Sequence, residues 1–507
     1  PIWRQSRWGG GQGGERPGDG AVSTVRRSLV YSALEGWVAI FFQVASTVVI
    51  ARLLSPAEMG VFAVGAVFAS LASTVRDFGV AEYLIQEKEL SRDAFRAALS
   101  VNIAISWLMA ALLFVLAPAV ADFYRQEGVE AVMRVQSASF LLIPFGAVTM
   151  AWFRRELNFR PIFIANVVGS FVSFVVSIAL AVRGHGYMSL AWSALAGVAA
   201  VVGVTAFLRP RTLPRWPGIR GIGEVVRFGR FVSGIYIVGE LGRAAPELII
   251  GRAQGVAAVG LFGRAYGVVE IFHRLVLRAI MRVCLPYFAN GVRGDGSPVR
   301  GLLTTISYIT GVGWVFLMFM AVSAYSVIRI VYGPQWTEAV ALAKILCAAA
   351  AVELLYFPAK EAMLAVGKAK ESSALQVWTQ VLRVLGLLGA IPFGLVGVGW
   401  GLLAAAAGGA WLSHRYLARA IGLRWEEVMR AARPSLAAAS LAVLPVWAWS
   451  VAVPVGEGNY ILFALAGSAL TGALWLMGVR LLGHPLWREI DSVIRRAVPG
   501  KGAQRAA

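Results

Sequence analysis

Charged residues and cysteines are scarce in this sequence of 507 residues. Only 15% of the residues are charged, whereas 58% are hydrophobic, and the mean hydropathy is +0.70. Soluble domains contain about 25% charged residues, so this composition excludes an ordinary soluble protein and indicates a chain that lies in a bilayer. The two cysteines, Cys284 and Cys347, have no CxxC spacing. They therefore predict neither a disulfide framework nor a metal site.

Sequence signatures of catalysis are also absent. There is no GxxxxGK[ST] phosphate-binding loop, because Gly367-Lys368 is followed by Ala369. The triplet at 77–79 reads DFG, as in kinases, but no HRD loop accompanies it, so we interpret it as a turn at a helix end. HExxH, GxSxG and DxD patterns are missing, which disfavours a protease, a hydrolase and a metal-dependent glycosyltransferase. The sequence predicts a protein that is not an enzyme and that needs no cofactor.

Long apolar segments dominate what is present. A membrane-spanning helix needs about 20 apolar residues, and such segments are too uniformly apolar for barrel strands, which alternate over about ten residues. The predicted fold class is therefore an all-α integral membrane protein with about 14 transmembrane helices. The fourteen candidate spans are 28–51, 60–76, 98–121, 129–153, 161–182, 186–208, 228–251, 257–280, 302–325, 337–357, 372–392, 395–418, 435–453 and 459–482.

The basic residues alternate along the chain with the expected topology. The net charge is +20, and arginines and lysines concentrate in every second connection, notably 209–230 and the tail 480–505. By the positive-inside rule this pattern places both termini in the cytoplasm, and helical spans indicate a bacterial inner membrane. The basic flanks favour contact with anionic lipids. Since no folded basic domain is left over, the charge does not indicate nucleic-acid binding.

An internal repeat relates the two halves of the chain. Residues 51–66 align with 251–266 at an offset of 200 without a gap, so that Gly60 meets Gly260. Because each half holds an even number of spans, we expect two parallel six-helix repeats plus two C-terminal helices, a transporter architecture. The predicted parts are a disordered tail 1–27, a first half 28–208, a cytoplasmic linker 209–227, a second half 228–418, two extra helices 435–482 and a basic cytoplasmic tail 483–507.

Several motifs resemble one transporter family. They are ARLLSPAEMGVFA at 51–63, DFGVAEYLIQ at 77–86, VGLFGRAY at 259–266, CLPYFANGVRGD at 284–295, YGPQWTEAVALAKIL at 332–346 and AVGKAKES at 365–372. With them the chain resembles the O-antigen and exopolysaccharide flippases of the multidrug/oligosaccharidyl-lipid/polysaccharide exporter superfamily. The resemblance implies that a lipid-pyrophosphate-linked oligosaccharide is moved from the inner to the outer leaflet by alternating access, for the synthesis of surface polysaccharide. It also implies membrane lipids as partners, together with a polysaccharide polymerase and export machinery.

Ionisable residues inside the spans are the candidate site, since each is costly in a bilayer and normally faces a cavity or a partner. In span 228–251, Glu240, Arg243 and Glu247 share one helical face, and Pro246 lies between them. This pattern predicts a polar cavity, the alternative being an ion pair between Arg243 and Glu247 that merely neutralises both.

Further candidates for binding the substrate lie on two later spans. They are Arg264, Arg274, Arg383, Gln376 and Gln380. A guanidinium presents a fork of donors that matches phosphate oxygens, and Arg264 lies deepest along its span, whereas Arg274 could equally extend toward the cytoplasm. The glutamines could bind sugar hydroxyls or hold helices together.

A coupling proton or sodium ion would need carboxylates within the spans. Glu35, Glu240 and Glu353 are the candidates, although each could instead serve only as the partner of an arginine.

Two other functions of the protein stay open at this point. One is an ion-coupled multidrug exporter of the same superfamily, whose cationic cargo would prefer an acidic cleft, and the other is a membrane glycan polymerase or transferase, which would need a large extracytoplasmic loop.

Overall fold

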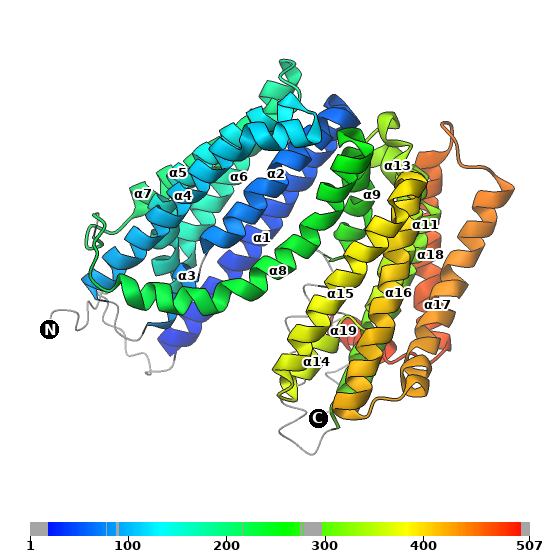
Figure 1. Cartoon of the computed structure of the whole chain (residues 1–507). Coiled ribbons are helices and arrows are strands. Elements are labelled where there is room, and N and C mark those ends of the chain that lie inside the picture. Colours follow the sequence, from blue (N-terminus) through cyan, green and yellow to red (C-terminus); the bar gives the residue numbers. More distant parts are fainter. Residues whose placement is uncertain are drawn as a thin grey trace.

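The computed structural model describes residues 19–77, 79–87, 91–214, 216–273, 277 and 297–497. Over these residues the chain is helical and contains no strand. The predicted all-α class is therefore confirmed. Figure 1 shows long helices in two side-by-side groups.

The first group is built from residues 19–208. Its helices are α1 (Asp19–Leu53), α2 (Pro56–Asp77), α3 (Val80–Gln86), α4 (Arg92–Tyr124), α5 (Glu127–Arg155), α6 (Phe159–Val182) and α7 (Met188–Leu208). Local signals set the helix ends. The Ser91 hydroxyl accepts a hydrogen bond from the Ala94 amide at 3.0 Å and so caps the start of α4.

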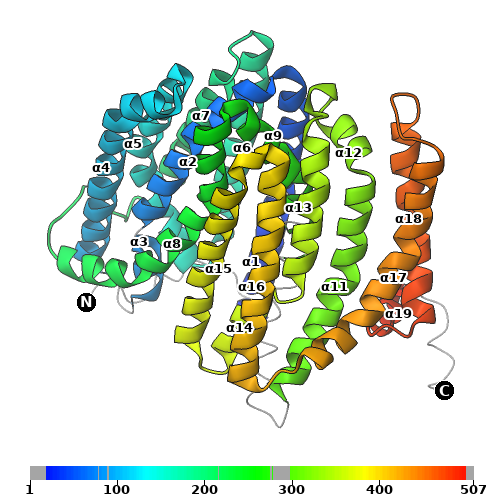
Figure 2. The same ribbon diagram turned by 45° about the vertical axis from the view of Figure 1, so that its right-hand side comes forward.

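The second group follows after the segment 209–221. Its helices are α8 (Ile222–Gln254), α9 (Val256–Phe272), α11 (Pro298–Val322), α12 (Ala324–Val331), α13 (Ala339–Leu354), α14 (Ala359–Ala365), α15 (Ala369–Ala390) and α16 (Gly394–Ile421), with short 3-10 turns at Pro334–Trp336 and Ile391–Phe393. Three helices close the chain, namely α17 (Trp425–Ala452), α18 (Tyr460–Leu481) and α19 (Leu486–Ala497). In Figure 2, α17 and α18 lie beside α11, on the outer side of the second group.

The described residues contain eleven segments long and apolar enough to cross a membrane. One of them, Ala369–Ile421, covers both α15 and α16, whereas the charge-bearing helices α8 and α9 are not among them. Large apolar side chains face outward over this surface, with Phe207 89% exposed and Leu465 66% exposed. Such exposure would be costly in water and is expected in lipid. The chain is a multi-pass membrane protein, and the layout of fourteen spans in two repeats stays a prediction.

Two predicted boundaries differ from the structure. Helix α1 begins at Asp19, inside the segment for which the sequence predicted a disordered tail, and residues 1–18 lie outside the described residues. The segment predicted as a basic tail contains the amphipathic helix α19 before residue 498, where the described residues end. Helix α1 extends beyond its apolar window because basic and acidic residues also favour helices once a span is nucleated. Helix α19 is a separate helix that begins after the turn between Leu481 and Leu486.

The segment 209–221 is fastened to the first group. Arg96 of α4 donates to the carbonyl oxygens of Trp216 (3.3 Å) and Pro217 (3.2 Å), and Ser100 donates to the carbonyl oxygen of Gly218 (2.7 Å). The helix that follows, α8, contacts α2, α3 and α4 of the first group as well as α15 of the second. Figure 1 shows α8 curving from beneath the first group up to α9.

The two groups meet where α2 crosses α9. A Cβ atom on Gly60 would lie 1.7 Å from the carbonyl oxygen of Val256, and one on Gly260 would lie 2.1 Å from that of Pro56. These contacts are reciprocal, because Pro56 and Val256 are also 200 positions apart. The glycines therefore allow backbone-to-backbone contact at a crossing that follows the sequence repeat.

Candidate substrate cleft

A cavity of about 450 Å³ lies between the two groups. Its lining comes from α1, α8, α9, α12 and α15 and includes Ile40, Gln43, Val44, Thr47, Val48, Arg243, Pro246, Glu247, Phe262, Arg264, Tyr266, Glu270, Tyr332 and Arg383. Every charged lining residue belongs to the second group, and arginines outnumber glutamates by three to two. We call this cavity the cleft.

Arg243 is held by an ion pair on its own helix. Its Nε donates to Glu240 Oε2 at 2.9 Å, its Nη2 also contacts Glu240 Oε1, and it donates to Ser70 Oγ of α2 at 3.0 Å. The alternative of an ion pair with Glu247 is therefore corrected, since the structure pairs Arg243 with Glu240, one turn earlier. The Arg243 side chain is still 58% exposed, so the pairing leaves it accessible from the cleft.

Among the described residues, aromatic rings and not carboxylates lie next to the Arg264 guanidinium. Its guanidinium carbon lies 5.2 Å from the ring centre of Tyr332 and 5.4 Å from that of Trp336, and its Nη2 lies 3.7 Å from Met59 Sδ. Within the described part of the chain, no carboxylate lies within ion-pair distance of Arg264. Aromatic faces stabilise a cation without neutralising it, so this positive charge is available to an anion.

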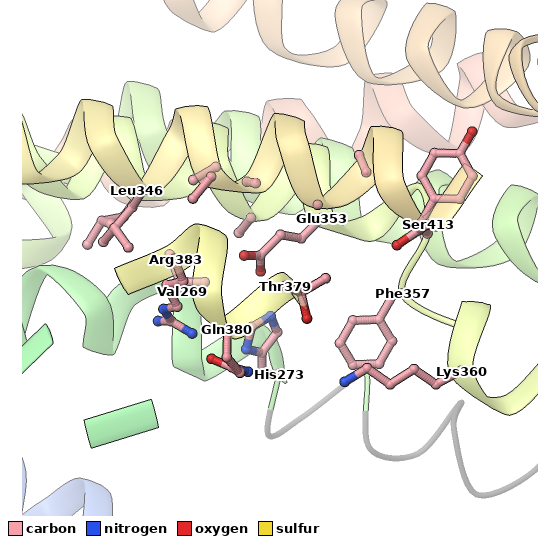
Figure 3. A pocket seen from close by; sticks show the side chains of 18 of the residues that line it. Val269, His273, Leu346, Glu353, Phe357, Lys360, Thr379, Gln380, Arg383 and Ser413 are labelled. Carbon is pink, nitrogen blue, oxygen red and sulfur yellow. The ribbon is translucent and has the colours of Figure 1, made fainter. Parts of the chain in front are cut away.

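Arg383 stands between the cleft and a second cavity. The second cavity, of about 270 Å³, lies between α9, α13, α15 and α16, and both cavities share Arg383 and Tyr266. In Figure 3, Arg383 and Gln380 project from the same side of α15, and Glu353 of α13 points toward them. Thus Gln380 and Glu353 line the second cavity and not the cleft.

Gln376 takes a different position from Gln380. Its Nε2 would lie 3.2 Å from a Cβ atom on Gly239 of α8, and it lines neither cavity. Of the two readings of the α15 glutamines, the structure thus favours helix packing for Gln376. Arg274, a further candidate, lies outside the described residues.

The three coupling-ion candidates lie apart from one another. Glu35 accepts a hydrogen bond from Asn166 Nδ2 of α6 at 2.5 Å, Glu240 pairs with Arg243, and Glu353 faces the second cavity. Among the residues that were searched, those described above, no three His, Cys, Asp or Glu side chains form a group that could hold a metal ion.

The end of the cleft at the turn between α1 and α2 is closed by polar contacts between the groups. Gln335 Nε2 (2.6 Å) and Trp336 Nε1 (2.8 Å) both donate to the carbonyl oxygen of Ala51, and Arg52 donates to that of Ile330 (2.6 Å). Sequence reasoning noted the YGPQW motif at 332–336 as a family signature but did not assign Tyr332 or Trp336 to the site. The signal was available in part, because Tyr and Trp faces attract cations.

The fold and the cleft define a multi-pass membrane transporter built from two helical groups around an arginine-lined cavity. The chain belongs to the family described as "Polysaccharide biosynthesis protein", which matches residues 49–341. This agrees with the resemblance that the loop motifs indicated.

Two relatives match over most of their length. The chain is 23% identical to the lipopolysaccharide biosynthesis protein WzxC of Escherichia coli (strain K12) over 382 residues, which are 74% of this chain and 76% of WzxC. It is also 23% identical to the succinoglycan biosynthesis transport protein ExoT of Rhizobium meliloti (strain 1021), over 95% of this chain and 99% of ExoT.

Solved structures show the same fold. The lipid II flippase MurJ in an inward closed conformation aligns with a TM-score of 0.70 at 10% identity, over 90% of this chain and 99% of MurJ. A multidrug resistance transporter of the MATE family, in an inward-facing conformation and also of the MOP superfamily, aligns with a TM-score of 0.57 at 15% identity, over 75% of this chain and 95% of its own. The chain therefore has the fold of the superfamily that its motifs resemble.

Proposed function

We propose that this protein flips lipid-pyrophosphate-linked oligosaccharides across the bacterial inner membrane for the synthesis of surface polysaccharide. The observation that carries the proposal is Arg264, an arginine surrounded by aromatic rings at the boundary of the two groups, with no carboxylate partner in the described structure. The relatives named above support it, because one is named for lipopolysaccharide synthesis and the other for succinoglycan transport.

The chemical problem of flipping is the anionic pyrophosphate. Moving it through hydrocarbon would strip its water, at a cost of several kcal/mol or more per charge. Arg243, Arg264 and Arg383 line one cavity, and guanidinium groups replace lost water with charge-assisted hydrogen bonds. The lipid tail remains in the surrounding bilayer throughout, and the sugars occupy the protein interior.

The conformational cycle uses the crossing of α2 and α9. We place both termini in the cytoplasm, so that the closed end at Ala51 and Trp336 faces outward and the cleft belongs to an inward-facing arrangement. Two parallel six-helix repeats rock about Gly60 and Gly260, and the contacts that Ala51 accepts break when the outer end opens. A coupling ion, where one is used, has Glu35, Glu240 and Glu353 as its candidate sites.

The alternative of a multidrug exporter has less support. Cationic drugs require an acidic cavity, whereas arginines exceed glutamates in this cleft. The other alternative, a membrane polymerase or transferase, would need a large extracytoplasmic loop. Within the described residues the connections between helices at the closed end are short, as between Leu53 and Pro56.

The test is translocation in proteoliposomes. Purified protein is reconstituted with fluorescent undecaprenyl-pyrophosphate oligosaccharides, and exposure of the glycan on the far leaflet is followed with a membrane-impermeant quencher. We expect protein-dependent exposure that Arg264→Ala abolishes and Arg134→Ala preserves. Arg134 is the matched control because it pairs with Glu130 outside the cleft. Expulsion of cationic dyes against an ion gradient, without movement of any glycolipid, would establish the drug exporter instead.

A further inference from the structure

The second cavity carries polar groups that the pyrophosphate site does not use. It is lined by side chains of α9, α13, α14, α15 and α16. Figure 3 shows Gln380 and Thr379 on one wall, Glu353 opposite them and Phe357 with Lys360 toward the far end. This set combines donors, acceptors and an aromatic ring in one space.

Three of the groups at this cavity have a buried atom with unused hydrogen-bonding capacity. Glu361 Oε2, Gln380 Oε1 and Arg383 Nε are all buried, and none has a hydrogen-bond partner among the described residues. Buried polar atoms are nearly always satisfied in folded proteins. These three atoms are closed off from the cavity as it stands, but their side chains belong to its lining and offer both acceptors and a donor. Such a lining suits a ligand that has both donors and acceptors.

The charges of this cavity cancel, unlike those of the cleft. Lys360 and Arg383 face Glu353 and Glu361. His273, which also lines the cavity, lies 3.7 Å from Glu270 on its own helix. A balanced set of charges gives no net preference for an anion or a cation, and it favours a neutral ligand with many hydrogen-bonding groups.

The volume and the lining side chains of the cavity restrict the class of ligand further. A volume of about 270 Å³ is below the roughly 300–1,000 Å³ of drug-sized sites, so it accommodates a small unit. Aromatic side chains of Tyr266, Tyr356 and Phe357 contribute to the lining. They offer flat apolar faces to the C–H surface of a ring, while the polar groups meet its hydroxyls. These are the requirements of a sugar.

We propose that the second cavity binds a sugar residue of the lipid-linked glycan while the cleft holds its pyrophosphate. The proposal rests on the function proposed above. Its geometric basis is that Arg383 and Tyr266 line both cavities. Because the first sugar is bonded directly to the pyrophosphate, its site must adjoin the phosphate site. Arg383 then contacts the link between the two parts of the substrate.

The first experiment compares two substrates in proteoliposomes. One is undecaprenyl pyrophosphate carrying the oligosaccharide, and the other is undecaprenyl pyrophosphate without sugar. Gln380→Leu removes its acceptor and Glu361→Gln replaces one carboxylate oxygen by an amide donor. Gln376→Leu is the control on the same helix as Gln380, outside both cavities. We expect both cavity variants to slow the glycosylated lipid about 10-fold, as for one lost hydrogen bond in a desolvated site. We expect them to change transport of the sugar-free lipid by less than twofold.

The second experiment measures occupancy without transport. Thr379→Cys is introduced after both native cysteines are replaced by alanine, and its labelling rate with a small thiol reagent is recorded. We expect the glycosylated lipid to protect this cysteine and the sugar-free lipid to leave it reactive. Protection by sodium ions alone would overturn the sugar site in favour of a cation site.

The outcomes separate this inference from the proposed function. If Arg264→Ala stops both lipids while the cavity variants slow both equally or neither, the flippase stands and the sugar site is wrong. If the wild-type protein moves neither lipid, the proposed function is overturned and the sugar site with it.

Discussion

The two sides of the cleft derive from one sequence repeat but differ in charge. At the offset of 200 residues, Gln43 corresponds to Arg243, Thr47 to Glu247 and Val64 to Arg264. The glycines at the crossing are kept in both copies, whereas the charges occur only in the second. The repeat therefore preserves the contact between the groups, whereas one copy alone supplies the charged residues of the cleft.

The largest loss of flipping rate is expected at Arg264, where the first copy of the repeat has the uncharged Val64. Arg264→Ala removes a charge whose neighbours are aromatic, so we expect flipping to fall about 100-fold or more, corresponding to roughly 3 kcal/mol. Arg264→Lys keeps the charge but loses the fork of donors, and we expect an intermediate rate. Initial rates in proteoliposomes measure both. Equal rates for lysine and alanine would mean that charge alone is not what the site uses.

The second-largest effect is expected at the crossing of α2 and α9, where both copies of the repeat have a glycine. Gly60→Ala and Gly260→Ala each place a methyl group in contact with a backbone carbonyl. Overpacking costs about 1–3 kcal/mol, so we expect the closed outer end to lose population by about 10-fold. Distances between spin labels at Asp93 and Arg300, the exposed starts of α4 and α11, report this change. Gly203→Ala is the control, since open space surrounds it, and an identical distance distribution in all three variants would contradict the pivot.

Exchanging charge between the copies should have a smaller effect. Arg243→Gln removes an arginine that Glu240 already compensates, so we expect a loss of about 3- to 10-fold. Adding Gln43→Arg returns a positive charge to the same cleft, and we expect it to recover part of the rate. Gln43→Arg alone is the control. If the double variant is slower than Arg243→Gln, the charge must come from the second copy.

The smallest predicted effect is on thermal stability, and it arises at His484, away from the cleft. His484, between α18 and α19, is buried, and its Nδ1 accepts a hydrogen bond from the Leu486 amide at 3.1 Å. Burial lowers the pKa of His484 below its usual value of 6.5. Below pH 6.5 the unfolded chain therefore binds more protons than the folded chain, and stability falls as pH decreases toward the folded-state pKa. We expect thermal melting in detergent to show this decline between pH 7 and 5, and His484→Gln to flatten it.

Much of the fold could be read from the sequence, because helical spans leave a strong apolar signal and the repeat is ungapped. Thirteen of the fourteen predicted spans fall on helices, and the remaining one, 257–280, begins on α9 and continues outside the described residues. Helix α8 carries too many charged residues to qualify as a span by composition, and the 17 described residues of α9 are too few. The site was partly predictable because arginines such as Arg264 and Arg383 stand out in otherwise apolar segments. The partner of Arg243 was not predictable, because Glu240 and Glu247 lie on the same helical face and only the packing against Ser70 distinguishes them. Nor could the sequence separate Gln376 from Gln380, since both pack against glycines of α8 and only Gln380 also lines a cavity.

Helix α8 begins on a segment bound to the first group and ends at the turn into α9, a helix of the second group. It also contains Pro246, which cannot donate the backbone hydrogen bond that would stiffen that turn. In the proposed cycle the groups move apart while both ends of α8 are held, so we expect the displacement to be taken up along the length of this helix. The position of the Arg243 charge in the cleft is then expected to change with the degree of opening.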